Sequence, residues 1–70
     1  MNIDIVRNKI NDNIGKKVIV TVYGLRNKIT KHEGILHKTY PNIFSIIEDG
    51  IEKSFSYNDY IIGDVRIKYL

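Results

Sequence analysis

The fold is decided by the stretch from Gly34 to Tyr60, which reads GILHKTYPNIFSIIEDGIEKSFSYNDY. Gly34 lies inside a long strand pattern, where a glycine favours a bulge or a sharp bend. Pro41 predicts a turn, because proline fixes its own φ and keeps the preceding residue extended. Asp49 and Gly50 predict a two-residue hairpin turn, since both residue types tolerate positive φ. The stretch therefore predicts strands at 29–40, 43–48 and 53–57.

The same alternation continues on both sides of this stretch. Residues 17–23 alternate in hydrophobicity, which predicts a first strand with one strongly apolar face. Residues 65–69 alternate in the same way and predict a fifth strand. Residues 58–63 are too few for a helix of ordinary length, so they predict a single 3₁₀ turn before that strand.

Residues 1–14 predict a short amphipathic helix, which must pack on the strands because so short a helix is marginal alone. Its apolar face consists of residues three or four positions apart, namely Ile3, Val6, Ile10 and Ile14. Asn2 can cap the start, since its side-chain oxygen accepts a free N–H of the first turn. Gly15 suits the left-handed position just after the helix.

One helix followed by five short strands predicts a mainly β fold and a single domain over residues 1–70. The helix would occupy residues 1–14, and a five-stranded SH3-like or Sm-like small β-barrel would occupy 16–70. Closure of the barrel would hide most strand edges, which a small β protein needs. A chain of this size buries only about 60% of its unfolded surface, which leaves little room for a deep catalytic pocket.

In their order along the chain, these signals resemble the Veg family of small bacterial proteins, typical of Firmicutes. The resemblance covers residues 10–69 and rests on five stretches: Ile14 to Lys17, Gly24 to Lys28, Gly34 to Leu36, Thr39 to Pro41 with Phe44, and Phe55 to Tyr57 with Asp59. It implies an N-terminal helix, an SH3-like barrel and a cytoplasmic regulatory role connected with expression of biofilm-matrix genes. It implies no catalytic residues. The chain departs from the family in having only two cations in the loop at 24–28 and no acidic tail.

Composition indicates a soluble cytoplasmic protein. The chain is 43% hydrophobic and has no cysteine, so it holds neither a disulfide nor a thiolate metal site. No apolar run approaches the ~20 residues of a membrane span. The first nine residues lack the apolar segment of a signal peptide.

The net charge of +3 is unevenly distributed. Residues 1–38 hold eight Lys and Arg against three Asp and Glu, a balance of +5, whereas residues 39–70 hold three against five, a balance of −2. A basic half attracts polyanions. The abundance of Ile, Asn and Lys is also what AT-rich codon usage produces, so part of the lysine content can be without function.

The leading hypothesis is a non-enzymatic regulator of gene expression that binds nucleic acid through a basic face. Small barrels bind single strands by combining a basic groove with aromatic rings on which bases stack. The predicted binding residues are five cations and two rings, namely Lys17, Tyr23, Arg26, Lys28, Lys31, Lys38 and Tyr40. In the alternative interpretation, the cations only solvate the surface and the two tyrosines cover the ends of the core.

The second hypothesis is a protein-interaction module or homodimer that modulates a transcription regulator without touching nucleic acid. SH3-like barrels bind peptides in aromatic grooves or through strand edges. Ile19, Ile43 and Ile47 lie on the strand faces opposite the predicted core and would form an apolar patch if exposed. We favour the interpretation that the N-terminal helix covers some of them with Ile3, Val6 and Ile10, and leave the others open.

The remaining polar residues predict structural roles. Ser56 and Asp59 favour the capping of a turn over catalysis, because such side chains readily bond nearby backbone N–H groups. Tyr57 is expected to bury its ring beside Phe55. His32 and His37 lie five positions apart, on opposite faces of a straight strand, so no metal site is predicted. Without a phosphate loop, acid–base pair or nucleophile motif, no enzyme activity and no cofactor are expected.

Overall fold

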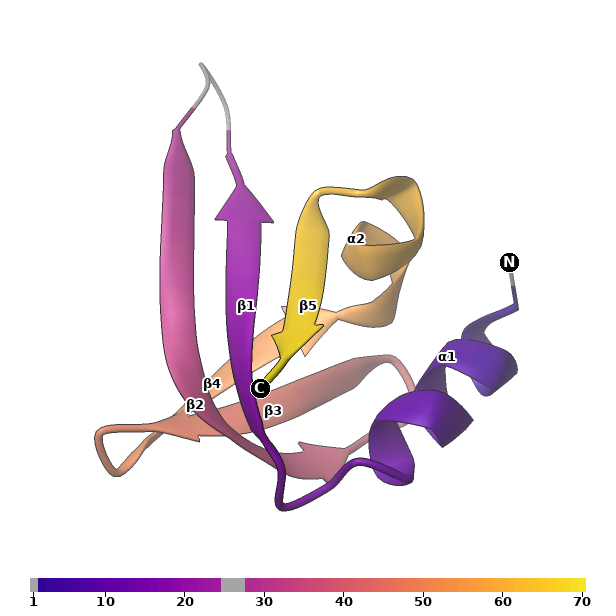
Figure 1. The fold of residues 1–70 in the computed structure, drawn as a ribbon. Coiled ribbons are helices and arrows are strands. Elements are labelled where there is room, and N and C mark those ends of the chain that lie inside the picture. The colour runs from indigo at the N-terminus through magenta and orange to yellow at the C-terminus, as the bar shows by residue number, and fades with distance from the viewer. Residues whose placement is uncertain (1, 25–27) are drawn as a thin grey trace.

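The protein is mainly β, with five strands and two short helices (Figure 1). It is described by a computed structural model over residues 2–24 and 28–70. The elements, in chain order, are α1 (Ile3–Asn11), β1 (Lys17–Tyr23), β2 (Ile29–Thr39), β3 (Ile43–Glu48), β4 (Ile51–Ser56), α2 (Tyr57–Ile62) and β5 (Val65–Tyr69). The predicted mainly β fold, with an N-terminal helix and five strands, is confirmed.

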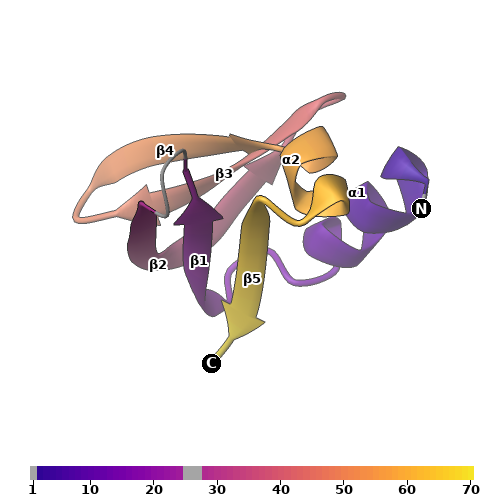
Figure 2. The same ribbon diagram turned by 90° about the horizontal axis from the view of Figure 1, so that it is seen from above.

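The five strands form one antiparallel sheet in the order β4-β3-β2-β1-β5. β4 and β5 are therefore the two edges of the sheet, and the predicted closure of the barrel is not made by strand pairing. The sheet is bent instead, so that β3 and β4 run behind β1 and β5 in the view of Figure 1, and lie on the opposite side of the molecule from β5 when seen from above (Figure 2). The two helices lie at the open side, between β5 and the β3–β4 hairpin (Figures 1 and 2).

The bend is located in β2. Its first half pairs with β1, and its second half, from Ile35 to Thr39, pairs with β3. A Cβ atom on Gly34 would collide with the carbonyl oxygen of Ile47 and come within 3.0 Å of the carbonyl carbon. Only glycine permits this approach of two backbones. A register shift between Leu36 and Lys38 adds a bulge at His37, which increases the local bend.

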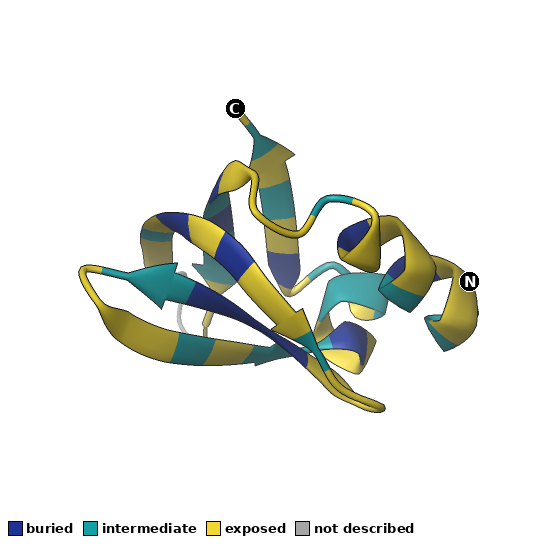
Figure 3. Cartoon of the chain, turned by 90° about the horizontal axis from the view of Figure 1, so that it is seen from below, coloured by how far each residue is buried: buried dark blue, intermediate teal, exposed yellow. Residues whose placement is uncertain are grey.

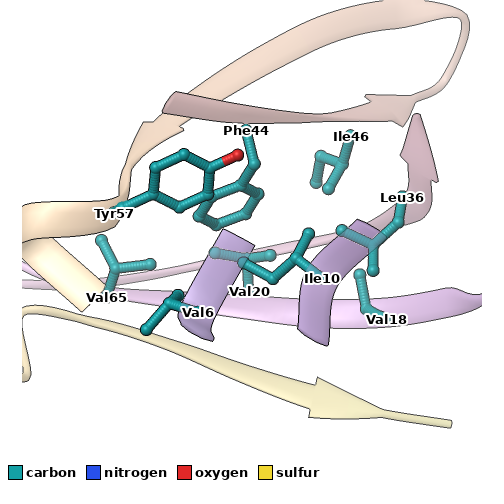
Figure 4. Packing of buried hydrophobic residues seen from close by; sticks show 9 residues of the cluster. All are labelled: Val6, Ile10, Val18, Val20, Leu36, Phe44, Ile46, Tyr57 and Val65. Atoms are coloured by element: carbon teal, nitrogen blue, oxygen red, sulfur yellow. The ribbon is translucent and has the colours of Figure 1, made fainter. Parts of the chain in front are cut away.

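The core lies between the inner face of the bent sheet and α1 (Figures 3 and 4). Tyr57 stacks on Phe44 with ring centroids 5.7 Å apart, and Phe44 in turn contacts Phe55. The predicted burial of Tyr57 is confirmed, although Phe44 is its direct neighbour. The buried apolar residues are Val6, Ile10, Val18, Val20, Leu36, Phe44, Ile46, Tyr57 and Val65.

The N-terminal helix is shorter than predicted, because it ends at Asn11. Its start is as expected, since the Asn2 side chain accepts the N–H of Asp4 at 2.8 Å. Gly15 has the predicted positive φ, 91°, but a turn separates it from the helix. Ile14 lies in that turn and is 39% exposed, so it is not part of the buried helix face.

The hairpin between β3 and β4 has the predicted turn, with φ of 52° at Asp49 and 79° at Gly50. The prediction of a 3₁₀ turn after β4 is wrong, because residues 57–62 form a short α-helix. The side chain of Ser56 caps its start by accepting the N–H of Asn58 at 3.1 Å, as predicted for this serine. Gly63 ends it with φ of 92°.

Candidate functional site

Several exposed cations gather on the outer face of β2, β1 and β5, the face turned away from the core. Lys31 and Arg66 both lie directly opposite Thr21, one on each neighbouring strand. Their backbones are therefore about 10 Å apart, twice the spacing of adjacent strands. The four exposed cations on this face, called the basic face below, are Lys17, Lys31, Arg66 and Lys68.

Tyr23 is the aromatic ring of the basic face. It is 37% exposed, and the guanidinium carbon of Arg66 lies 5.0 Å from its ring centroid. This cation–π contact places the guanidinium over one face of the ring. The arrangement offers one positive charge and one exposed ring, which is the pair of groups that a nucleotide requires.

One acidic residue, Glu33, lies on β2 within the basic face. Its carboxylate is 3.5 Å from the ammonium of Lys17, and the two side chains are 55% and 62% exposed. An exposed pair of this kind contributes at most about 1 kcal/mol and is screened by salt. Lys17 thus shares its charge with Glu33, whereas no salt bridge forms on Lys31, Arg66 or Lys68 among the described residues.

Two further predicted cations belong to the loop between β1 and β2. Lys28 is exposed just before β2, at the same end of the sheet as Tyr23. Arg26 lies outside the described residues. Lys28 therefore extends the basic face toward this loop.

Lys38 and Tyr40 lie apart from the other predicted residues, because they follow the bulge in β2. Lys38 is opposite Ser45 on β3. The hydroxyls of Ser45 and Tyr40 both donate to the same carboxylate oxygen of Glu52, at 2.9 and 3.3 Å. Desolvation, and then the Glu52 carboxylate, raise the pKa of Tyr40. An acid beside this ring disfavours a phosphate there, so Tyr40 is poorly placed to stack a base.

The sheet is thus divided by charge. β1, β2 and β5 carry five Lys and Arg and one Glu, whereas β3 and β4 carry two Glu and one Lys, with Asp49 in their turn. Except for Lys38, which follows the bulge, these cations lie on the side of the bend where β2 pairs with β1. That side has the sign of charge that favours polyanions.

Glu48 connects the two halves at the point where β2 leaves β3. Its carboxylate receives the N–H of Glu33 at 3.2 Å and lies 3.0 Å from Nδ1 of His32. The hydrogen bond with His32 is the largest of the interactions that lower the pKa of Glu48. His37 is exposed at the bulge, and the described residues contain no group of three His, Cys, Asp or Glu positioned for a metal.

The expectation that α1 covers some of the outer isoleucines is wrong. Val6 and Ile10 of α1 enter the inner core instead. Ile19 and Ile47 are partly exposed, and Ile43 is 37% exposed. The outer face also contains Ile35, 49% exposed and opposite Ile47.

A family model described as biofilm formation stimulator VEG matches residues 1–68 of the chain. The chain belongs to this family. A comparison with curated proteins found no match. Membership of the VEG family supports a regulatory role related to biofilm formation, and the family description names no enzymatic activity.

The stretches that resemble the VEG family are mainly architectural in the structure. Gly34 permits the bend of β2, Pro41 lies in the turn before β3, and Ser56 caps α2. No described helix of this VEG protein is long and apolar enough to cross a bilayer.

Two residues of the basic face, Arg66 and Lys68, were not among the predicted binding residues. They belong to residues 39–70, whose net charge is −2, so the distribution of charge along the sequence did not indicate them as binding residues. The available signal was their alternation with the inward residues of β5. It shows that they face outward, but only the β1–β5 register shows that they lie beside Lys31.

Proposed function

We propose that this VEG protein is a non-enzymatic regulator of gene expression in biofilm formation, and that it binds nucleic acid through the basic face. The observation that supports the proposal best is the row formed by Lys31, Thr21 and Arg66 across three strands. Cations on adjacent strands form a two-dimensional array, which can contact successive phosphates of one backbone. Such phosphate contacts supply most of the affinity of non-specific binding.

The role of Tyr23 in this proposal is to stack a base at the end of the array. Arg66 lies over the ring, and the ring remains 37% exposed. A base that stacks on an aromatic ring contributes about 1–3 kcal/mol, with little dependence on sequence. Lys28 and Arg26 would add charge from the adjacent loop. Lys38 and Tyr40 would contribute less, because both follow the bulge of β2 and Tyr40 is bonded to Glu52.

Fluorescence anisotropy with labelled single-stranded DNA, single-stranded RNA and duplex DNA tests the proposal. Three cations bound to phosphates of a single strand give a slope of about −2 for log K against log salt, and removal of one such cation reduces its magnitude by about 0.7. We expect this reduction for Lys31→Gln and for Arg66→Gln. Lys9→Gln, which removes an exposed cation from α1, is the matched control.

Two results contradict the proposal. Absence of binding at low salt, where phosphate contacts are strongest, excludes nucleic acid as the ligand. An equal loss of affinity in Lys9→Gln and Arg66→Gln shows that net charge, and not the basic face, is responsible.

The alternative function, a protein-interaction module or homodimer, is favoured by the isoleucines of the outer face. Ile35 is 49% exposed and lies opposite Ile47. Exposed apolar residues in contact mark interaction surfaces when they form a patch. Sedimentation of the wild type and of Ile35→Lys over a wide range of concentration tests self-association. A monomer at all concentrations contradicts the homodimer.

A further inference from the structure

Within residues 2–24 and 28–70, β5 pairs with β1 alone, and this pairing shows which backbone groups of β5 point to the unpaired side. Leu70, just after β5, donates its N–H to the carbonyl of Lys17 at 3.1 Å. In an antiparallel ladder, the residues whose N–H and C=O point to the same neighbour recur at every second position. Arg66 and Lys68 therefore face β1, and the backbone groups of Ile67 and Tyr69 point to the free edge.

An open groove of about 330 Å³ lies along this edge. Its walls come from α2, from the turn after it and from the first half of β5. The side chains of Tyr60 and Ile67 make it largely apolar. The lining residues are Tyr60, Gly63, Val65, Arg66 and Ile67.

The two faces of β5 differ in charge. Val65 and Ile67 point to the inner face, whereas Arg66 and Lys68 point to the outer face and are exposed. The edge thus alternates between apolar and cationic residues. β4, the other edge, shows no such alternation, because Lys53 lies on its inner face and Glu52 on its outer face.

We propose that the free edge of β5 binds an extended acidic segment of a partner protein as a sixth strand. Residues that are opposite each other on adjacent strands share a face. A guest strand therefore needs acidic residues opposite Arg66 and Lys68, and an apolar residue opposite Ile67. Backbone hydrogen bonds supply affinity, and the alternation supplies specificity. This proposal goes beyond nucleic-acid binding and does not depend on it.

Hydrogen exchange of the whole chain with a synthetic peptide tests the proposal. The probe is a capped peptide of about seven residues, the length of an ordinary strand, that alternates Glu and Val. When nine-tenths of the protein is bound, the amides of Ile67 and Tyr69 should exchange about tenfold more slowly, because only the free tenth exchanges. The amides of Arg66 and Lys68 already face β1 and should change little.

Two controls test the backbone and the charges separately. N-methylation of alternate peptide amides removes the hydrogen bonds on one edge of the peptide only. One of the two possible methylation sets should therefore abolish binding, and the other should preserve it. The double variant Arg66→Glu, Lys68→Glu should bind the Glu–Val peptide about tenfold more weakly, because two exposed ion pairs are replaced by two pairs of like charge. The same variant should bind a matched Lys–Val peptide more tightly than the wild type does.

Three outcomes overturn the proposal. The first is no binding of the Glu peptide, which leaves Arg66 and Lys68 as charges that protect an edge from aggregation. The second is binding that leaves the exchange of Ile67 and Tyr69 unchanged. The third is protection of these amides that rises with protein concentration without peptide, which assigns the edge to a second copy of the chain. If the peptide does not bind, the proposal of nucleic-acid binding is unaffected, because the salt dependence of nucleic-acid affinity tests it separately.

Discussion

Replacement of Gly34 by alanine tests the closest approach in the fold. An added Cβ would collide with the carbonyl oxygen of Ile47, lie 3.0 Å from its carbonyl carbon and 3.2 Å from Cδ1 of Ile46. The first two atoms belong to the backbone of β3 and cannot rotate away. Gly34 itself is buried, so the methyl group cannot move into solvent. Gly34→Ala must therefore separate β2 from β3 at the bend.

The expected loss is about 2 kcal/mol. Overpacking costs typically about 1–3 kcal/mol, and a clash with backbone lies toward the upper end. Because φ of Gly34 is not positive, alanine regains about 0.4–1 kcal/mol by restricting the unfolded chain. For a chain of this size, a loss of about 2 kcal/mol lowers Tm by about 8–16 °C.

Urea and thermal unfolding of Gly34→Ala measure this loss. Gly24→Ala is the matched control, because its φ is also not positive and its nearest contact would be the Lys28 carbonyl oxygen at 3.3 Å. It should leave the free energy of unfolding unchanged or raise it by up to about 1 kcal/mol, because alanine restricts the unfolded chain there too and meets no atom closer than 3.3 Å. Equal stability of the two variants would refute the close approach of β2 and β3.

Three other substitutions test single contacts. The buried hydroxyl of Tyr57 has no partner in good hydrogen-bond geometry among the described residues, although the Tyr40 backbone and the Thr39 side chain lie near enough to act on its pKa, which burial raises. Tyr57→Phe should therefore change the free energy of unfolding by less than about 1 kcal/mol in urea unfolding. A larger loss would show a bonded hydroxyl. The hydrogen bond with His32 lowers the pKa of Glu48 in the folded protein, so the Glu48 carboxylate stabilises the fold above its usual pKa of 4.5. The free energy of unfolding of wild type should exceed that of Glu48→Gln above pH 4.5, and the difference should disappear as the pH falls below that value. A difference that does not depend on pH contradicts this. Ser56→Ala should lower the free energy of unfolding by about 1 kcal/mol, because it removes the cap of α2. Ser54→Ala, at an exposed position of β4, is the control and should leave the free energy of unfolding almost unchanged in the same assay. Equal losses in the two variants would contradict the capping role.

Local signals in the sequence predicted most of the elements. The cap at Asn2 and the hairpin at Asp49 depend on residues within a few positions of each other, and both are confirmed. α2 was not predicted, although Ser56 and Gly63 are its start and stop signals. Six residues are fewer than an ordinary helix contains, and the contribution of its buried Tyr57 to the core is a tertiary effect. The open edges of β4 and β5 also follow from tertiary packing, because the two helices fill the side where a barrel would close.

The candidate site could be predicted only in part, because its residues come together through strand register. Lys17, Tyr23 and Lys31 were predicted from one half of the chain, and the β1–β2 ladder does place them on one face. Arg66 joins them through the β1–β5 ladder, which no local pattern reveals. Their role in binding stays a prediction.

The bend of β2 relates the architecture of the VEG protein to its charge. Gly34 and the bulge at His37 turn one long strand into two segments that belong to different halves of the sheet. The acidic hairpin of β3 and β4 is thereby directed away from the outer face of β1 and β5, where like charges of Arg66 and Lys68 remain close together. Such crowding of like charge costs stability, and nothing in the core requires it, since these side chains are exposed. An anionic ligand would offset this cost, so the basic face and the adjoining edge of β5 are the surfaces to test first for binding.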